Sequence, residues 1–177
     1  ALRVIGVSLA NNHAMDFGKT AYQDMVRELQ RNGIRIIGRG EYADFERFRL
    51  FGFTDIDNSP EPKRDLLYRS DMDAAFQAAP GSGLPLFAFL HWGDEYSEDF
   101  DARQDILRGE LLEKGIELIV GSHSHRSSRL RCDRSSCVVP SLGNFLFDQK
   151  GSHVSGHMLK VTFFPQGTYS VTELPLE

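Results

Sequence analysis

Apolar and polar positions along the chain follow two different periods, which predicts a mixed α/β fold. Between two apolar runs at 3–9 and 34–37 lies a segment with one apolar face, ended by Asn32-Gly33. The residues of that face are spaced i, i+3, i+4 and i+7, as in a helix: Tyr22, Met25, Val26 and Leu29. The first 37 residues therefore predict a βαβ unit with a buried first strand.

The same patterns continue through the rest of the chain. Helices are predicted at 71–79 and 102–114, and the second places Ile106, Leu107, Leu111 and Leu112 at its apolar positions. Apolar runs bounded by turn residues predict strands at 48–53, 84–90 and 116–120, and 57–62 is loop-like. From residue 129 onward the pattern favours antiparallel strands at 138–139, 145–147, 158–164 and 169–174. We therefore expect a layered α/β domain with a β-rich end.

Composition narrows the class of protein. A chain of 177 residues, 41% hydrophobic and 25% charged, suits one globular domain. The net charge of -5 provides no basic field, which excludes nucleic acid as a partner on electrostatic grounds. An anionic substrate would therefore need positive charge at the binding site itself, for example from metal ions.

Only two cysteines occur, Cys132 and Cys137, and they flank the tip of a predicted hairpin. They could form a disulfide or remain two thiols, and export would favour the disulfide. Closing so short a loop would contribute only about 2 kcal/mol to stability.

Histidines follow three of the predicted strands. Asn12-His13 follows the first, His91 the strand at 84–90, and His123 and His125 the strand at 116–120. Ligand sites in open α/β sheets lie beyond the carboxyl ends of strands, and a His-x-His spacing can direct both rings to one side. The alternative is a set of structural histidines. For His153 and His157 we expect a structural role.

Four ordered segments carry a family resemblance. Residues 8–18, 91–96, 121–125 and 141–145 resemble, in order and spacing, the motifs of the bacterial CapA/PgsA poly-γ-glutamate capsule biosynthesis family. That family is similar to the calcineurin-like metallophosphoesterases, so the resemblance implies an αββα four-layer sandwich. The superfamily's Asp-x-His and Gly-Asp segments do not occur at the start of this chain. We therefore expect residues 1–177 to be the C-terminal two-thirds of a single CapA-type domain.

The resemblance also implies site roles. Asn12, His91 and His123 would bind one metal and His125 a second, with His13 as general acid. Neutral imidazoles and one amide suit divalent transition metals, so we expect two ions of Mn, Fe or Zn in the complete domain. Because the second ion keeps only His125 from this chain, we expect weak or no phosphoesterase activity from these residues alone.

Supporting roles are less determined. Asp16 could orient His13 or cap the following helix. Trp92 and Tyr96 could line the substrate or pack in the core. Three further residues are assigned to the substrate or to a supporting role: Glu95, which could instead be a solvated carboxylate; Arg126, where the family has an apolar residue; and Asn144, expected to fix a turn.

The leading hypothesis is a metal-dependent hydrolase in capsule biosynthesis that acts on a phosphoester or a glutamyl amide. The alternatives are a non-catalytic capsule-assembly component and an unrelated metal-dependent phosphatase. The expected partners are an anionic polymer or phosphoester substrate and other capsule-synthesis membrane proteins. We expect an extracytoplasmic location at the cell envelope, with a membrane anchor in a segment upstream of this chain.

Overall fold

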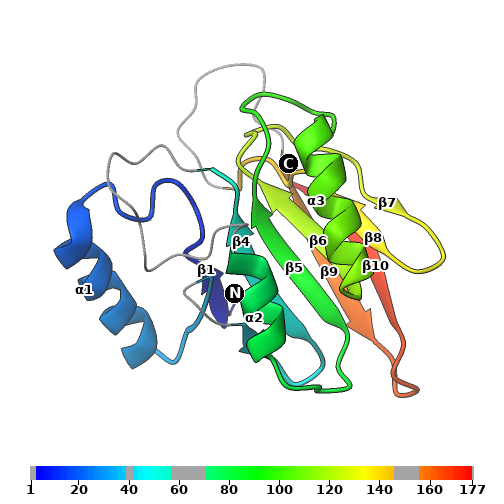
Figure 1. Cartoon of the computed structure of the whole chain (residues 1–177), viewed down its shortest axis with the longest axis horizontal. Helices are drawn as coiled ribbons and strands as arrows, with labels where there is room; N and C mark the ends of the chain where they lie inside the picture. The colour runs from blue at the N-terminus through cyan, green and yellow to red at the C-terminus, as the bar shows by residue number, and fades with distance from the viewer. Residues whose placement is uncertain (1–2, 39–41, 57–70, 146–155, 177) are drawn as a thin grey trace. The chain divides into compact units, whose positions relative to one another are not determined.

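The computed structural model describes residues 3–38, 42–56, 71–145 and 156–176, in two compact units that span residues 1–91 and 92–177. Each unit combines helices with strands (Figure 1), which confirms the predicted α/β class. The loop predicted at 57–62, most of the strand predicted at 145–147, and His153 lie outside the described residues. The two units are described separately below.

The first unit begins with the predicted βαβ arrangement. Strand β1 (Gly6–Ser8) and strand β2 (Arg35–Ile37) pair in parallel, and helix α1 (Gly18–Arg31) connects them. Tyr22 and Val26 of α1 are buried together with Leu9, as the helical periodicity predicted. The expectation of a buried first strand is wrong, because Val4 and Ile5 are exposed and all three residues of β1 are only partly buried.

The remaining strands of this unit form a second sheet region. Strand β4 (Arg49–Thr54) pairs antiparallel with β3 (Ala43–Asp44) and parallel with β5 (Leu86–His91). Helix α2 (Met72–Ala78) contributes Phe76, whose ring centroid lies 4.2 Å from that of buried Phe51. These aromatic contacts fix β4, which pairs with the strand that ends at His91.

A buried arginine also holds this sheet. Arg49 lies on β4 and bonds both carboxylate oxygens of Asp44 on β3, at 2.6 and 2.8 Å. This bidentate hydrogen bond lowers the pKa of the Asp44 carboxyl. The edge strand β3 is therefore fastened by a charged pair in addition to its backbone bonds.

The second unit is built around β6 (Ile116–Ser122) and α3 (Ala102–Glu113), which pack against each other. Asp101 and Gln104 form a capping box at the start of α3, and Leu107 and Leu111 are buried. Ile106 is exposed, so its predicted core position is wrong. The buried face of α3 runs along 104, 107 and 111, and residue 106 points away from that face at 100° per residue.

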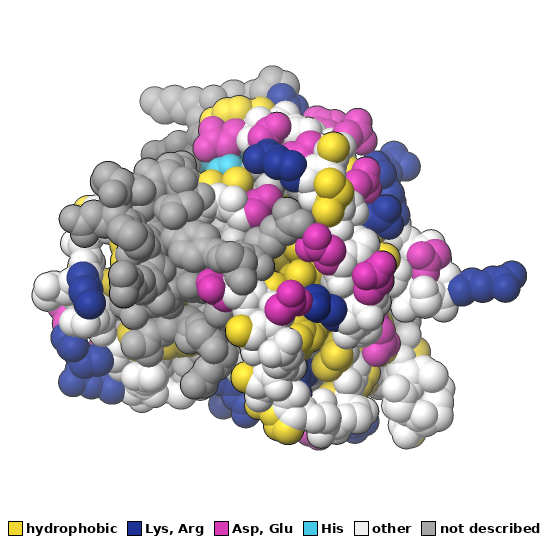
Figure 2. All heavy atoms as spheres, in the orientation of Figure 1, with side chains coloured by type: hydrophobic (Ala, Val, Ile, Leu, Met, Phe, Trp, Pro, Cys, Tyr) yellow, Lys and Arg dark blue, Asp and Glu magenta, His cyan; other side chains and the backbone are white. Residues whose placement is uncertain are grey.

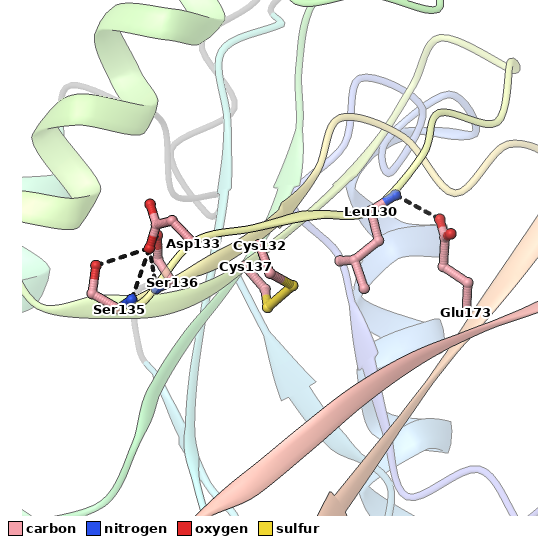
Figure 3. The surroundings of a disulfide bond; sticks show 7 residues. All are labelled: Leu130, Cys132, Asp133, Ser135, Ser136, Cys137 and Glu173. Atoms are coloured by element: carbon pink, nitrogen blue, oxygen red, sulfur yellow. Dashed lines mark hydrogen bonds between the residues drawn. A yellow bond between two sulfur atoms is a disulfide. The ribbon is translucent and has the colours of Figure 1, made fainter.

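Strand β8 (Cys137–Val139) pairs in parallel with β6 and antiparallel with β7 (Arg131–Cys132). The prediction of only antiparallel pairing after residue 129 is therefore wrong for β8. Cys132 and Cys137 form a disulfide across the hairpin, one of the two alternatives that the sequence left open. Asp133 accepts hydrogen bonds from the backbone amides of Ser135 and Ser136 at the tip (Figure 3).

The last two strands, β9 (Gly156–Phe163) and β10 (Tyr169–Leu176), form the predicted antiparallel hairpin. Glu173 of β10 accepts a hydrogen bond of 2.6 Å from the backbone amide of Leu130, as Figure 3 shows. This bond ties the hairpin to the segment before β7. Within the described ranges, no helix has the length and apolar character needed to cross a membrane.

Candidate functional site

In the first unit, Asn12 and His91 meet although they are far apart in the sequence. Asn12 follows β1 and is 5% exposed, and His91 is the last residue of β5. The Oδ1 atom of Asn12 lies 2.8 Å from Nε2 of His91. The backbone oxygen of His91 accepts bonds from Thr54 Oγ1 and the Asp55 amide, at 3.0 and 3.2 Å. The end of β5 is therefore fixed, and it presents the imidazole to the amide.

The atoms of this pair suit a shared metal ion. An imidazole nitrogen and an amide oxygen are both ligand atoms, and two ligands bonded at about 2.0–2.2 Å to one ion lie roughly 3 Å apart. The observed 2.8 Å between Nε2 and Oδ1 is therefore compatible with joint ligation after a small shift. Neutral nitrogen and oxygen donors favour Mn, Fe or Zn over harder ions.

His13 and Asp16 form a second pair in this unit. His13 Nδ1 lies 2.7 Å from Asp16 Oδ2, with both side chains at least half exposed. Asp16 does not cap α1, because the N-cap residue is Phe17 and no side chain bonds the first turn. Of the two sequence-based alternatives, the structure therefore favours the one in which Asp16 orients the His13 ring.

In the second unit, the turn after β6 has an unusual backbone. His123 and His125 have φ angles of 101° and 60°, and Tyr96 has 64°. Positive φ is strained for residues other than glycine, at a cost of about 1–3 kcal/mol each, and such strain clusters at functional sites. The Tyr96 amide donates to the Ser124 oxygen at 2.6 Å, so the two loops bond to each other.

Tyr96 also contacts a candidate ligand. Its ring stacks on the imidazole of His125, with centroids 6.0 Å apart and planes 28° apart. Tyr96 is 56% exposed, so the alternative that it packs in the core is wrong. Trp92, in contrast, is buried, and its Nε1 donates to the Pro140 oxygen at 2.8 Å. Nothing in the spacing of the sequence showed that Tyr96 would meet His125, because the two residues lie on different loops.

Asn144 is a second neighbour of His125. Its Oδ1 lies 2.8 Å from His125 Nδ1, and the Asn144 residue is buried. Sequence reasoning expected Asn144 to fix a turn and missed this contact with a candidate ligand. An Nδ1–H bonded to the amide oxygen fixes the tautomer that leaves Nε2 as a ligand atom.

Gly121 explains how these segments approach so closely. A Cβ atom at this position would lie 1.8 Å from the Pro140 oxygen, and the Gly121 oxygen accepts a bond from the Leu142 amide at 3.0 Å. The chain that carries His123 and His125 therefore lies directly beside the chain that carries Asn144. Only glycine allows this approach.

Comparison with known proteins identifies the family. Residues 1–51 and 54–149 match the family described as "Bacterial capsule synthesis protein PGA_cap". The chain belongs to this family. It is 26% identical over 163 residues to the PGA biosynthesis protein CapA of Bacillus subtilis, covering 79% of this chain and 42% of that protein.

Two further curated relatives agree with the PGA_cap assignment. The capsule biosynthesis protein CapA of Bacillus anthracis is 27% identical over 165 residues, which cover 81% of this chain and 40% of that protein. A Mycobacterium tuberculosis protein named "Probable polyglutamine synthesis accessory protein" is 25% identical over 187 residues, covering 89% and 48%. The chain thus spans less than half the length of these relatives.

The remaining residues considered in the sequence analysis lie in the second unit. Glu95 is exposed, and Arg126 Nη1 contacts Glu98 Oε1 at 3.1 Å. His157, expected to be structural, lies on β9 with Nδ1 3.7 Å from Glu173 Oε1. In the part of the chain that the structure describes, no three His, Cys, Asp or Glu side chains are grouped as metal ligands. Asn12, an amide, is outside that set of residue types.

Proposed function

We propose that this chain is part of a poly-γ-glutamate capsule-biosynthesis protein and carries residues of a metal-dependent hydrolytic site. Membership in the PGA_cap family and the names of the CapA relatives support the capsule role. The observation that carries the metal site is the 2.8 Å contact between Asn12 Oδ1 and His91 Nε2. A buried amide and a half-buried imidazole that converge at a strand end are typical of a ligand site.

In this proposal Asn12 and His91 hold one ion. That His123 joins them and that His125 serves a second ion follows from the family resemblance and stays a prediction, as does the αββα sandwich. Bound ions would orient a phosphoester or amide group and lower the pKa of a bound water. Asn144 would hold the orientation of the His125 ring through Nδ1.

The proposed acid is His13. With Nδ1 bonded to the Asp16 carboxylate, Nε2 is the ring nitrogen that can hold a proton for a leaving group. The pair is exposed, so its contribution to folding is small and its geometry matters mainly for orientation. A proton carrier at this position needs access to substrate, and the exposure of His13 is consistent with that need.

We further propose an extracytoplasmic location at the cell envelope. The Cys132–Cys137 disulfide supports it, because such bonds persist in oxidising compartments. The names of the capsule-biosynthesis relatives are consistent with a role at the cell envelope. An anchor outside this chain, an anionic polymer substrate and membrane-protein partners are further expectations from the resemblance.

The test combines metal titration with hydrolysis assays on a phosphodiester and on a γ-glutamyl peptide. We expect Asn12→Ala and His91→Ala each to weaken Mn²⁺ or Zn²⁺ binding at least about tenfold. Asn32→Ala and His157→Gln are the matched controls and should bind as the unaltered chain does. Unchanged binding in both Asn12→Ala and His91→Ala overturns the proposed site. The same assays should be repeated on a chain extended to the length of the relatives. If the extended chain also binds metal stoichiometrically but hydrolyses neither substrate, the alternative of a non-catalytic capsule-assembly component is favoured.

A further inference from the structure

The second unit contains a groove of about 450 Å³ beside α3 and the disulfide hairpin, and none of the proposed metal-site residues line it. We propose that this groove binds an amino-acid zwitterion. Arg108 and Arg131 would bind the carboxylate, and Asp99 and Asp105 the ammonium group.

The two arginines share one aromatic ring. The guanidinium carbons of Arg108 and Arg131 lie 5.7 and 5.5 Å from the ring centroid of Phe100. A contact of this kind positions a guanidinium through the face of the ring. It does not use the N–H groups, which can still donate hydrogen bonds to acceptors. The groove therefore contains two cationic groups that are positioned by the same side chain.

Arg108 also has an unused donor. Its Nε atom is buried and, among the described residues, has no hydrogen-bond acceptor, while its Nη2 lies 3.2 Å from Asp105 Oδ1. Buried polar groups in folded proteins are nearly always bonded, so an orphan N–H on an arginine that lines the groove leaves this guanidinium with capacity for a further acceptor. A carboxylate is the natural acceptor, because it can bond a guanidinium through both oxygens.

The two aspartates of the groove argue against a simple anion as its ligand. Asp99 and Asp105 pair with Arg131 and Arg108 at 3.2 Å, and their side chains are 88% and 55% exposed. Such exposed pairs are weak, so a carboxylate of a ligand can replace them. The released aspartates would then face the ligand. An anion without an ammonium group would meet only their repulsion, whereas the ammonium group of a zwitterion would be attracted.

Asp133 also lines the groove, but its carboxylate is already engaged (Figure 3). It accepts bonds from the backbone amides of Ser135 and Ser136, which lower its pKa. The groups available to a ligand are therefore two cations and two anions. A ligand that places one carboxylate and one ammonium group in the groove, as the α-groups of an amino acid do, matches this balance.

The volume and lining of the groove indicate the size of its ligand. Phe100, Leu112, Val138 and Cys132 line the groove together with the charged groups. Figure 2 shows acidic, basic and hydrophobic side chains among the coloured residues of the visible face. The groove volume lies in the range of small-molecule sites, which is enough for an amino acid or the first residue of a chain.

Two sources could supply this zwitterion. One is a free amino acid, and the other is the amino-terminal residue of a γ-linked glutamyl chain. That residue keeps both its α-ammonium and its α-carboxylate, because the linkage uses the γ-carboxyl group. Only the second source rests on the proposed capsule function.

The experiment is a titration of the full chain, followed by the amide NMR signals of α3 and the β7–β8 hairpin. The probes are glutamate, γ-glutamylglutamate, N-acetylglutamate and cadaverine. We expect one or both zwitterions to shift these signals, and the acetylated acid and the diamine to bind at least about tenfold more weakly. Tighter binding of the dipeptide indicates a chain end, and equal or tighter binding of glutamate indicates a free amino acid.

Variants assign the binding to the groove. Arg108→Gln and Arg131→Gln should each weaken binding about tenfold or more. Arg103→Gln is the matched control, because Arg103 is as exposed as Arg131, at 55%, and pairs with Asp94 outside the groove. Circular dichroism checks that each variant is folded.

Three results would overturn the inference: no shift with either zwitterion at about 10 mM, equal binding of N-acetylglutamate, or folded groove variants that bind as the control does. The metal titration of Asn12→Ala and His91→Ala is independent of these residues. Failure of the groove and failure of the metal site can therefore be told apart.

Discussion

Replacing Asn144 by alanine tests whether a residue that is not itself a proposed metal ligand controls metal binding at His125. Asn144 Oδ1 lies 2.8 Å from His125 Nδ1, so the amide fixes both the orientation of the ring and its tautomer. Without this acceptor the ring can rotate, and either nitrogen can carry the proton. We therefore expect weaker metal binding at His125, with the protein still folded.

The size of the effect follows from the type of contact. Loss of a residue that orients a metal-binding histidine typically weakens metal affinity by about 10–100-fold, or roughly 1.4–2.8 kcal/mol. The cost to folding should be smaller, at about 1 kcal/mol, because His125 is only partly buried and water can bond its free N–H. The two effects differ enough to be separated.

The measurement is calorimetric titration with Mn²⁺ or Zn²⁺, combined with urea unfolding. Asn144→Asp keeps an acceptor oxygen and should retain binding, and Asn32→Ala, an exposed asparagine at the end of α1, is the matched control. A folded Asn144→Ala variant with unchanged affinity would refute the positioning role, provided that His125→Ala does lose binding. If His125→Ala also binds metal normally, then His125 is not a metal ligand.

Three further predictions concern other parts of the chain. Asp44→Asn should lower the unfolding free energy by about 1 kcal/mol, since the buried Arg49 loses its charged partner and the Asp44 side chain is 45% exposed and partly screened. Because the pKa of Asp44 is lowered in the fold, this stabilisation is present above the unfolded pKa of about 3.9 and lost as pH falls through the folded value. Urea unfolding at pH 7 and pH 3 should therefore differ less in the variant, and equal differences would contradict the reasoning. Tyr96→Phe should keep the ring resonances of His125 while Tyr96→Ala shifts them, and an unchanged spectrum in Tyr96→Ala would remove the stacking role. Replacing Cys132 and Cys137 by serine should cost about 2 kcal/mol of stability, and an unchanged urea midpoint would count against it.

Much of the local structure could be predicted from the sequence. The periodicity of Tyr22, Met25, Val26 and Leu29 predicted α1 and its buried face, and the flanking apolar runs predicted the parallel pair β1 and β2. Boundaries were predicted to within a few residues for α2, α3, β4, β5, β6, β8, β9 and β10, whereas the two-residue strands β3 and β7 were not predicted. These features depend on side chains that are neighbours along a helix or strand, so a short window of sequence contains the information.

Other features were predicted incorrectly or left open. The parallel pairing of β8 with β6 was missed because short β segments show their own alternation and not their partner. For Asp16 the sequence left two roles open, helix cap or partner of His13, and the structure favours the second, since the helix begins after Phe17. In each case the local pattern was compatible with two structures, and contacts outside the pattern decided between them.

In the candidate site, too, the sequence determined some features and only the tertiary structure decided others. The sequence by itself identified Asn12, His91, His123 and His125 as candidate ligands, through strand ends and four ordered motifs. Only the tertiary structure brought the Asn12 amide to 2.8 Å from the His91 ring and placed Asn144 and Tyr96 against His125. The physical reason is that motif spacing records which residue follows which strand, whereas contacts between loops depend on the pairing of strands and on close approaches such as that of Gly121 to Pro140.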